Sequence, residues 1–323
     1  MESRNMVRAF AVTLAAALSF GVAAQPFPAK PARLLIGYST GGVVDILGRT
    51  VAQGLSEVWH QPVVPDNIPG ASTIIMAERC KRSAADGYTL CLVSADTFSL
   101  NPHLYSKLSY TTSDFVAVTS LVQAWEVIVV TPSLNVKTVQ ELASVASGRP
   151  GQLNYSSFGT GGLPHLVTEM VAQRLGVKMT HVPFKGAPPA LHAIVSGEVH
   201  VMYAAIANVL AHIQAGKLVP ITVAGQSRTP VLPTVPSFSE VGLDDIRARA
   251  WFGLAVPAGT PQRIVQKIHA DVVLAFQKPS LKQFFEKFSL EPLADAPEEF
   301  ARFLKADYER GRDMVKRANV RLD

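Results

Sequence analysis

Short apolar runs alternate with longer amphipathic stretches along most of the chain. The aliphatic run at 33–38 predicts a buried strand, and the apolar spacing of 45–58, after two glycines, predicts a helix. The other expected strands are 61–66, 88–94, 126–131, 152–157, 178–184, 199–203, 219–224 and 248–256. The other expected helices are 70–82, 138–146, 163–175, 188–196, 205–215, 261–276 and one that begins at Pro297. This alternation predicts an α/β protein with parallel sheets covered by helices on both faces.

The expected elements fall into two blocks. A second block with its own strands and helices begins near Trp125, and from Leu218 the pattern looks like a return to the first block. A proline-rich stretch at 230–236 predicts a loop in this returning part. The order of elements therefore favours two lobes, each with its own core.

The first 24 residues have the features of a secretory signal peptide. Arg4 and Arg8 give a positive start, an apolar stretch follows, and Val22-Ala23-Ala24 supplies the small residues that a signal peptidase requires. The apolar stretch is too short for a transmembrane helix, which needs about 20 apolar residues. We therefore expect residues 1–24 to be removed and the mature protein to be soluble and extracytoplasmic.

Charge and composition exclude several kinds of partner. The net charge is +5 at pH 7, but Lys and Arg are dispersed among Asp and Glu, and no basic run is interleaved with aromatic residues. This pattern argues against nucleic acid as a partner. Cys80 and Cys91 are expected late in a helix and in the next strand, where an oxidising compartment favours a disulfide over two buried thiols. No His or Cys lies at ligand spacing nearby, so no metal site is expected.

Two loops carry the residues of a candidate binding site. Each follows an expected strand and precedes an expected helix: Tyr38-Ser39-Thr40-Gly41-Gly42-Val43-Val44-Asp45 and Tyr155-Ser156-Ser157-Phe158-Gly159-Thr160-Gly161-Gly162. A helix start offers unpaired N–H groups, and glycines let a ligand approach the backbone, so each loop forms a cradle for a carboxylate or phosphate. Either loop alone could be an ordinary turn with capping residues. Two such loops, one in each block, favour a shared site between the lobes.

The sequence signatures of common enzyme families do not occur in the chain. No G-x-S-x-G, H-E-x-x-H or Walker A motif occurs, and Pro164 stands where a dinucleotide fingerprint beginning at Gly159 would need its third glycine. We therefore expect no cofactor. His165 either lines the cleft or is a hydrogen-bonded structural residue, and Lys185 either meets an anion or is a solvated surface residue.

Several short motifs occur in a fixed order along the chain. They are Gly41-Gly42-x-x-Asp45, Pro69-Gly70-Ala71, Asp-Gly-Tyr-Thr-Leu at 86–90, Asn-Pro-His-Leu-Tyr at 101–105, Leu-Asn-Tyr-Ser-Ser at 153–157, Pro164-His165-Leu166, Val-Pro-Phe-Lys-Gly at 182–186, Gly216-Lys217-Leu218, Trp-Phe-Gly-Leu at 251–254 and Pro-Ala-Gly-Thr-Pro at 257–261. In this order and spacing the chain resembles the solute-binding receptors of tripartite tricarboxylate transporters, the Bug family. The resemblance covers nearly all of the chain after the expected signal peptide.

The resemblance implies a type II periplasmic-binding-protein fold, with two α/β lobes, a ligand cleft between them and two crossovers. Lobe one would comprise 25–123 and 224–323, and lobe two 124–223. It further implies a monomeric periplasmic receptor, not an enzyme, that captures a small carboxylate for the membrane permease subunits of such a transporter. A sensory or adaptor protein on the same fold is one alternative, and an exported hydrolase that uses a loop hydroxyl with His165 is another.

The family binds carboxylates mainly through backbone amides, hydroxyls and ordered water, so the resemblance implies binding residues around the two loops. They are Tyr38, Ser39, Thr40, Gly41, Gly42, Asp45, Ser94, Thr97, Ser156, Ser157, Gly159, Thr160, His165, Lys185 and Ala204. Among them, Asp45 is expected to anchor its loop or a bound water rather than touch a carboxylate, since like charges repel. Asp96, after the 88–94 strand, is expected either to hold water or to cap a helix.

The chain departs from the family pattern at two places. Ser39-Thr40 replaces the usual Pro-Pro of the first loop, which adds hydroxyls and loosens the backbone. His200 and Ala204 replace two acidic residues of the strand before 205–215. An acidic residue at 204 would suit a ligand amino group, so its absence disfavours an amino-acid ligand.

Overall fold

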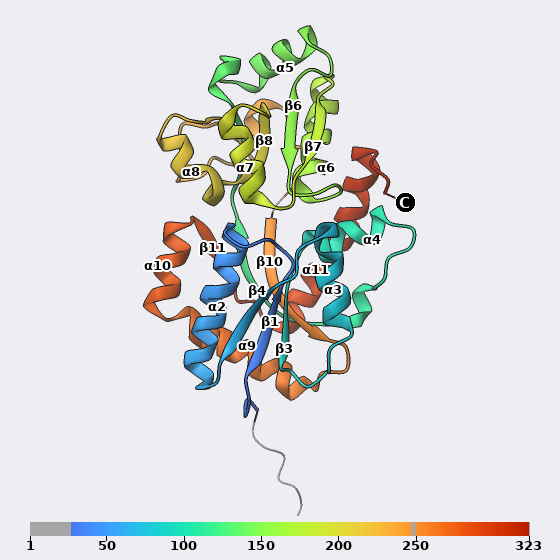
Figure 1. The fold of residues 1–323 in the computed structure, drawn as a ribbon, viewed down its shortest axis with the longest axis vertical. Coiled ribbons are helices and arrows are strands. Elements are labelled where there is room, and N and C mark those ends of the chain that lie inside the picture. Colours follow the sequence, from blue (N-terminus) through green and yellow to red (C-terminus); the bar gives the residue numbers. More distant parts are fainter. Residues whose placement is uncertain (1–26, 247, 249, 323) are drawn as a thin grey trace, which may run out of the picture.

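The described residues form two β-sheets, each flanked by helices, which make the two lobes of the molecule (Figure 1). The structure is a computed structural model in which residues 27–246, 248 and 250–322 are described. The expected signal peptide at 1–24 lies outside the described residues. We call the part built on the larger sheet the first lobe and the part built on the smaller sheet the second lobe.

The first lobe is built on a sheet with the strand order β11-β4-β10-β3-β1-β2. Its strands are β1 (Ala32–Ile36), β2 (Val63–Asn67), β3 (Thr89–Ser94), β4 (Phe115–Ala124), β10 (Ala250–Pro257) and β11 (Leu290–Pro292). Its helices are α2 (Val43–Trp59), α3 (Ile74–Lys81), α4 (Asn101–Leu104), α9 (Gln262–Phe276), α10 (Pro279–Lys287) and α11 (Pro297–Ala318). Strand β1 pairs in parallel with β2 and β3, whereas β10, β4 and β11 pair antiparallel with their neighbours.

The second lobe is built on a sheet with the strand order β7-β6-β8-β5-β9. Its strands are β5 (Glu126–Val130), β6 (Asn154–Ser157), β7 (Thr180–Pro183), β8 (Val201–Ala205) and β9 (Val219–Val223). Its helices are α5 (Val139–Gly148), α6 (Leu163–Leu175), α7 (Ala187–Ser196) and α8 (Ile206–Gln214). Strands β6, β7 and β8 are parallel, and β5 is antiparallel to both β8 and β9.

Both sheets are mixed, so the expectation of wholly parallel sheets is wrong. The antiparallel pairs involve the strands beside the crossovers, namely β4, β5, β9 and β10. A parallel pair needs a long crossover connection within one sheet, usually a helix. A strand that the chain enters from the other lobe has no such connection, so its direction is free.

The chain passes between the lobes around Trp125, because β4 ends at Ala124 in one sheet and β5 begins at Glu126 in the other. The return leads from β9 to β10. On this path the N–H group of Phe238 donates to the carbonyl oxygen of Val223 at 2.9 Å, and Ser237 bridges to the same residue. This part of the connecting loop therefore lies against the second sheet, and the boundaries expected from the sequence stay a prediction.

A disulfide and a buried carboxylate hold helices of the first lobe against its sheet. A disulfide joins Cys80 of α3 to Cys91 of β3, with the Cα atoms 6.2 Å apart. Buried Asp307 of α11 accepts a 2.8 Å hydrogen bond from Nε1 of Trp251 and another from the hydroxyl of Ser99. Among the described residues, no helix is both long and apolar enough to cross a membrane.

Gly311→Ala is expected to destabilise the protein, because a methyl group on α11 would overlap the carbonyl group of Ser99. We expect a loss of about 1–3 kcal/mol in the free energy of unfolding, as overpacking of this kind typically costs, measured by urea titration. Gly148→Ala, at the end of α5, is the matched control, since a methyl group there meets nothing within 4 Å. A loss of the same size in both variants would contradict this packing of α11.

Candidate functional site

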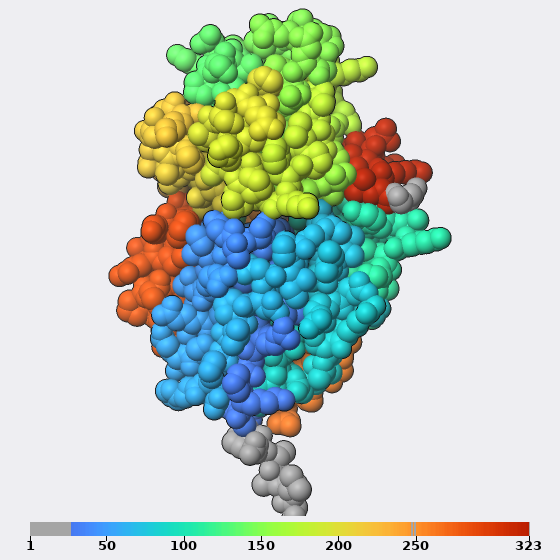
Figure 2. Space-filling model, in the orientation of Figure 1, coloured from blue at the N-terminus to red at the C-terminus, as the bar shows by residue number. Residues whose placement is uncertain are grey.

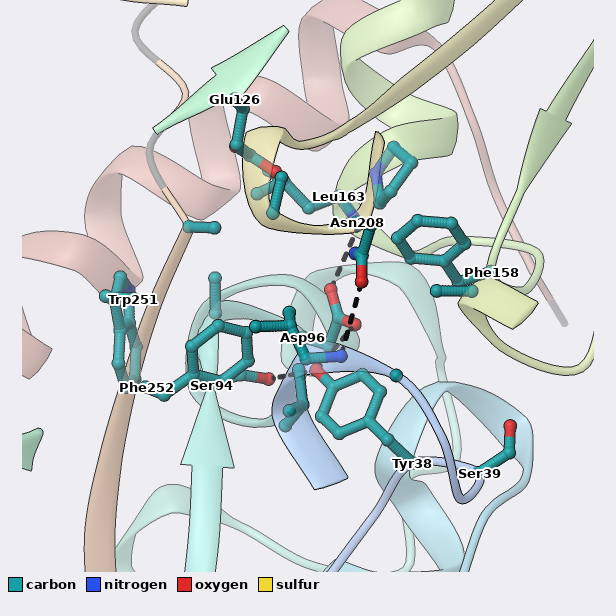
Figure 3. A pocket seen from close by; sticks show the side chains of 18 residues that line it. Tyr38, Ser39, Ser94, Asp96, Glu126, Phe158, Leu163, Asn208, Trp251 and Phe252 are labelled. Atoms are coloured by element: carbon teal, nitrogen blue, oxygen red, sulfur yellow. Dashed lines mark hydrogen bonds between the residues drawn. The ribbon is translucent and has the colours of Figure 1, made fainter. Parts of the chain in front are cut away.

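A cavity of about 60 Å³ lies between the two lobes (Figure 3). Residues that line it from the first lobe include Tyr38, Ser39, Gly42, Val43, Ser94, Asp96, Trp251 and Phe252. Residues from the second lobe include Glu126, Phe158, Leu163, Pro164, Ala187, Ala205 and Asn208. Figure 2 shows the atoms of the two lobes in direct contact at this level of the molecule.

Two helices of opposite lobes begin at this cavity. Helix α2 starts after Gly42 and α6 after Gly162, and neither glycine has a side chain to cap its helix. The cap comes from the other lobe in both cases. The N–H group of Val43 donates to Oδ1 of Asn208 at 3.2 Å, and that of Leu163 donates to Oδ1 of Asp96 at 3.0 Å (Figure 3).

Two further hydrogen bonds cross the boundary between the lobes. The hydroxyl of Ser39 donates to the carbonyl oxygen of Lys185 at 2.6 Å, and that of Ser72 donates to the carbonyl oxygen of Thr160 at 2.9 Å. Gly186 lies so close to the Ser39 side chain that a Cβ atom would overlap it, and its φ of 103° favours glycine. The two glycine loops therefore both face the opposite lobe, in a closed arrangement.

Asp45 anchors the first loop. Its carboxylate accepts hydrogen bonds from the N–H group of Gly41 at 3.0 Å, from Nε of Arg49 at 2.9 Å and from Nδ2 of Asn67 at 2.9 Å. Burial raises the pKa of this carboxyl group, but the three hydrogen bonds outweigh burial and lower it below the usual value. Asp45 is not among the cavity-lining residues, so it holds the backbone turn from behind.

Two acidic residues line the cavity. Burial raises the pKa of Asp96 to about 6, although hydrogen bonds from Leu163 and from the Tyr38 hydroxyl oppose the shift. Burial also raises the pKa of Glu126 to about 8, against hydrogen bonds from the Tyr203 hydroxyl, at 2.6 Å, and from the backbone of Ala250. Both carboxyl groups therefore sit in an environment of low polarity.

The hydroxyl of Ser157 in the second loop bonds within the second lobe and does not line the cavity. Ser157 is fully buried, and its Oγ lies 3.0 Å from the carbonyl oxygen of Gly159 and 2.6 Å from Nε2 of His181. His165 accepts a hydrogen bond from the N–H group of Gly161 at 3.0 Å and stacks on His181, with ring centroids 3.8 Å apart. These contacts fix the shape of the loop, and a hydroxyl with no exposed surface offers a substrate no access.

Of the residues expected from the sequence, Tyr38, Ser39, Gly42 and Ser94 line the cavity. The others lie outside its lining: Thr40, Gly41, Asp45, Thr97, Ser156, Ser157, Gly159, Thr160, His165, Lys185 and Ala204. Ala204 is fully buried in the apolar core of the second lobe, and Thr97 bonds to Thr73 at 2.9 Å. Ligand binding by these residues stays a prediction.

Sequence reasoning missed Glu126, Phe158 and Asn208 as lining residues, and it left the role of Asp96 open. Asp96 caps a helix, but a helix of the opposite lobe. The available signal for Glu126 was a charged residue at the first position of an otherwise apolar strand. Asn208 lies in the first turn of α8, directly after a strand, so the reasoning used for the two glycine loops could have found it.

A cavity at the boundary between two α/β lobes, with helix starts directed at it, is typical of two-lobed solute-binding proteins. The comparisons with known proteins agree. The family sequence model described as tripartite tricarboxylate transporter family receptor matches residues 47–320, and the chain belongs to this family. Among the described residues, no group of three or more acidic, His or Cys side chains is placed to hold a metal ion.

Relatives with similar sequences and structures cover nearly the whole chain. A Cupriavidus necator protein, the UPF0065 protein in the gbd 5' region, is 32% identical over 335 residues, 99% of each chain. R. palustris Rpa4515 with adipate has a TM-score of 0.87 at 30% identity, over 91% of this chain and 99% of that one. MatC from Rhodopseudomonas palustris with bound malate has a TM-score of 0.84 at 29% identity, over 90% and 100%.

Glu126→Gln is expected to stabilise the protein more at pH 9 than at pH 5. Burial raises the pKa of Glu126 in the folded state to about 8, above the unfolded value of 4.5. Its contribution to stability is therefore complete below pH 4.5 and is lost as the pH rises through 8. Thermal unfolding of both proteins at the two pH values measures the difference.

Glu198→Gln is the matched control for this prediction. Glu198 is exposed, and the substitution makes the same chemical change outside the cavity. Its effect on the melting temperature should be the same at both pH values. A Glu126→Gln effect that did not change with pH would contradict a raised pKa at this position.

Proposed function

We propose that this protein is a periplasmic receptor that binds a small carboxylate in the interlobe cavity and delivers it to the membrane permease subunits of a tripartite tricarboxylate-type transporter. One observation carries the proposal: two helix N-termini from opposite lobes converge on one cavity. Helix N-termini favour anions through their N–H groups and dipoles. Family membership, and relatives of similar structure that hold adipate and malate, support it further.

The proposed receptor is a monomer that closes around its ligand by a hinge motion. Lobe one would comprise 25–123 and 224–323 and lobe two 124–223, with Trp125 near one hinge. The hydrogen bonds that Ser39, Val43, Ser72 and Leu163 donate across the boundary would break when the lobes separate. The expected signal peptide at 1–24 would direct the chain to the periplasm. Membership of a transporter-receptor family favours this function over sensing or hydrolysis.

The ligand carboxylate is proposed to bind at the start of α2. There Ser39, Gly42 and Val43 line the cavity, and the partner of the Val43 N–H group across the boundary is the neutral amide of Asn208. At the start of α6 the position of an anion is already taken by Asp96. The second glycine loop would then support the site by its shape.

Gly42→Asp is expected to abolish binding of malate or adipate without loss of folding. Its φ of −82° suits any residue, and aspartate is a favoured N-cap, so the variant should be at least as stable as the parent. The new carboxylate would occupy the helix start and repel the ligand. Calorimetry with whichever acid gives a thermal shift measures the loss, since ligand at about 100 times its Kd stabilises by about 2.7 kcal/mol.

Gly42→Asn is the matched control, because it has the same size and capping ability without the charge. We expect it to retain more affinity than Gly42→Asp, by about tenfold or more. Equal affinity of the two variants for the same acid would show that no carboxylate binds at the start of α2. Binding of no carboxylate at all to the parent protein would count against the proposed function itself.

A further inference from the structure

The cavity contains two carboxyl groups, and among its described lining residues none is Lys, Arg or His. Asp96 accepts hydrogen bonds from the N–H group of Leu163 and the hydroxyl of Tyr38. Glu126 accepts from the hydroxyl of Tyr203 and the backbone of Ala250. All four donors are neutral, so neither carboxylate is compensated by a cation within the described part of the chain.

Most of the remaining wall is apolar and aromatic. Tyr38, Phe158 and Phe252 line the cavity with their rings, and the rings of Tyr38 and Phe252 lie 6.1 Å apart at 81° (Figure 3). Aromatic faces attract a cationic nitrogen, most strongly where water is excluded. The wall and the carboxyl groups therefore favour the same kind of ligand group.

We propose that the ligand carries a cationic nitrogen in addition to its carboxylate, as amino acids and betaines do. This inference rests on the proposed function, because it places the carboxylate at the start of α2, beside Asn208. The cationic nitrogen then lies among the aromatic rings, facing Asp96 and Glu126. A ligand with two or three carboxylates and no cation would instead bring further negative charge to two buried carboxyl groups.

This assignment reverses the expectation drawn from position 204. The absence of an acidic side chain there disfavoured an amino-acid ligand, but Ala204 lies in the apolar core of the second lobe and does not line the cavity. The neighbouring residue Ala205 lines it, and Glu126 pairs with Ala205 across the two strands. The acidic group that faces the ligand nitrogen is therefore Glu126 of β5 and not a residue at position 204 of β8.

The pH dependence of binding follows from the same geometry. The titratable groups that interact with Glu126 are Tyr203, Tyr38 and Asp96, and the cationic Arg310 acts on Tyr203. Those beside Asp96 are Tyr38, Tyr105 and Tyr110. A cationic nitrogen favours the ionised form of Glu126, so a permanently charged ligand should bind more tightly as the pH rises from 6 to 9. An anionic ligand without a cation should show the opposite trend.

The test uses pairs of probes that differ only in the charged nitrogen. They are glycine betaine with 3,3-dimethylbutanoate, L-alanine with 2-methylpropanoate, and L-aspartate with methylsuccinate, measured by calorimetry on protein refolded to remove bound solute. We expect the nitrogen-bearing member of at least one pair to bind about tenfold more tightly or better at pH 7. Glu126→Gln should remove this preference, Asp96→Asn should lower it, and Glu198→Gln should leave it intact.

The outcomes separate this inference from the proposed function. Tighter or equal binding of the nitrogen-free member in every pair overturns the inference, as does an unchanged preference in both Glu126→Gln and Asp96→Asn. Binding of malate or adipate without binding of any nitrogen-bearing probe overturns the inference and leaves the carboxylate receptor standing. Binding of choline as tightly as glycine betaine supports the cationic site and overturns the role of the carboxylate.

Discussion

The first N–H groups of a helix have no acceptor within the helix, and here two such helix starts obtain theirs from the opposite lobe. The acceptor for the start of α2 is Asn208, and the acceptor for the start of α6 is Asp96. These two hydrogen bonds contribute to the closed arrangement of the lobes and to the polarity of the cavity between them. When the lobes separate, water or a ligand must take over as acceptor, so closure and binding depend on the same backbone groups.

The two glycine loops look alike in sequence but have different roles in the closed protein. Asp96 brings a carboxylate to the start of α6, where its charge matches the positive end of the helix dipole. The start of α2 meets only the neutral Asn208. An anion that enters the cavity therefore finds one helix start already neutralised and one available. The difference between the two similar loops therefore comes from Asp96, which belongs to neither loop.

Local periodicity predicted most elements, because burial of one face repeats along a helix or strand. The helix expected at 163–175 matches α6, and the expected strand 126–131 differs from β5 by one residue. Strand β4 was missed, since its partners β10 and β11 lie far along the chain and its own pattern carries no clear signal. The order of the elements already favoured two lobes, and the family resemblance implied the particular fold, whereas periodicity predicted parallel sheets where the structure has mixed ones.

The sequence identified residue types in the loops but not the directions of their side chains. Ser157 and His165 have the chemistry of binding residues, yet their hydrogen bonds turn inward to Gly159, Gly161 and His181. Glu126 looks like an ordinary strand residue until β5 pairs with β8 and buries it beside Tyr203. A buried carboxyl group is costly unless it is compensated, and the described donors to Glu126, the Tyr203 hydroxyl and the Ala250 backbone, are neutral. Long-range pairing therefore places this carboxyl group beside the cavity, where a bound molecule can balance its charge.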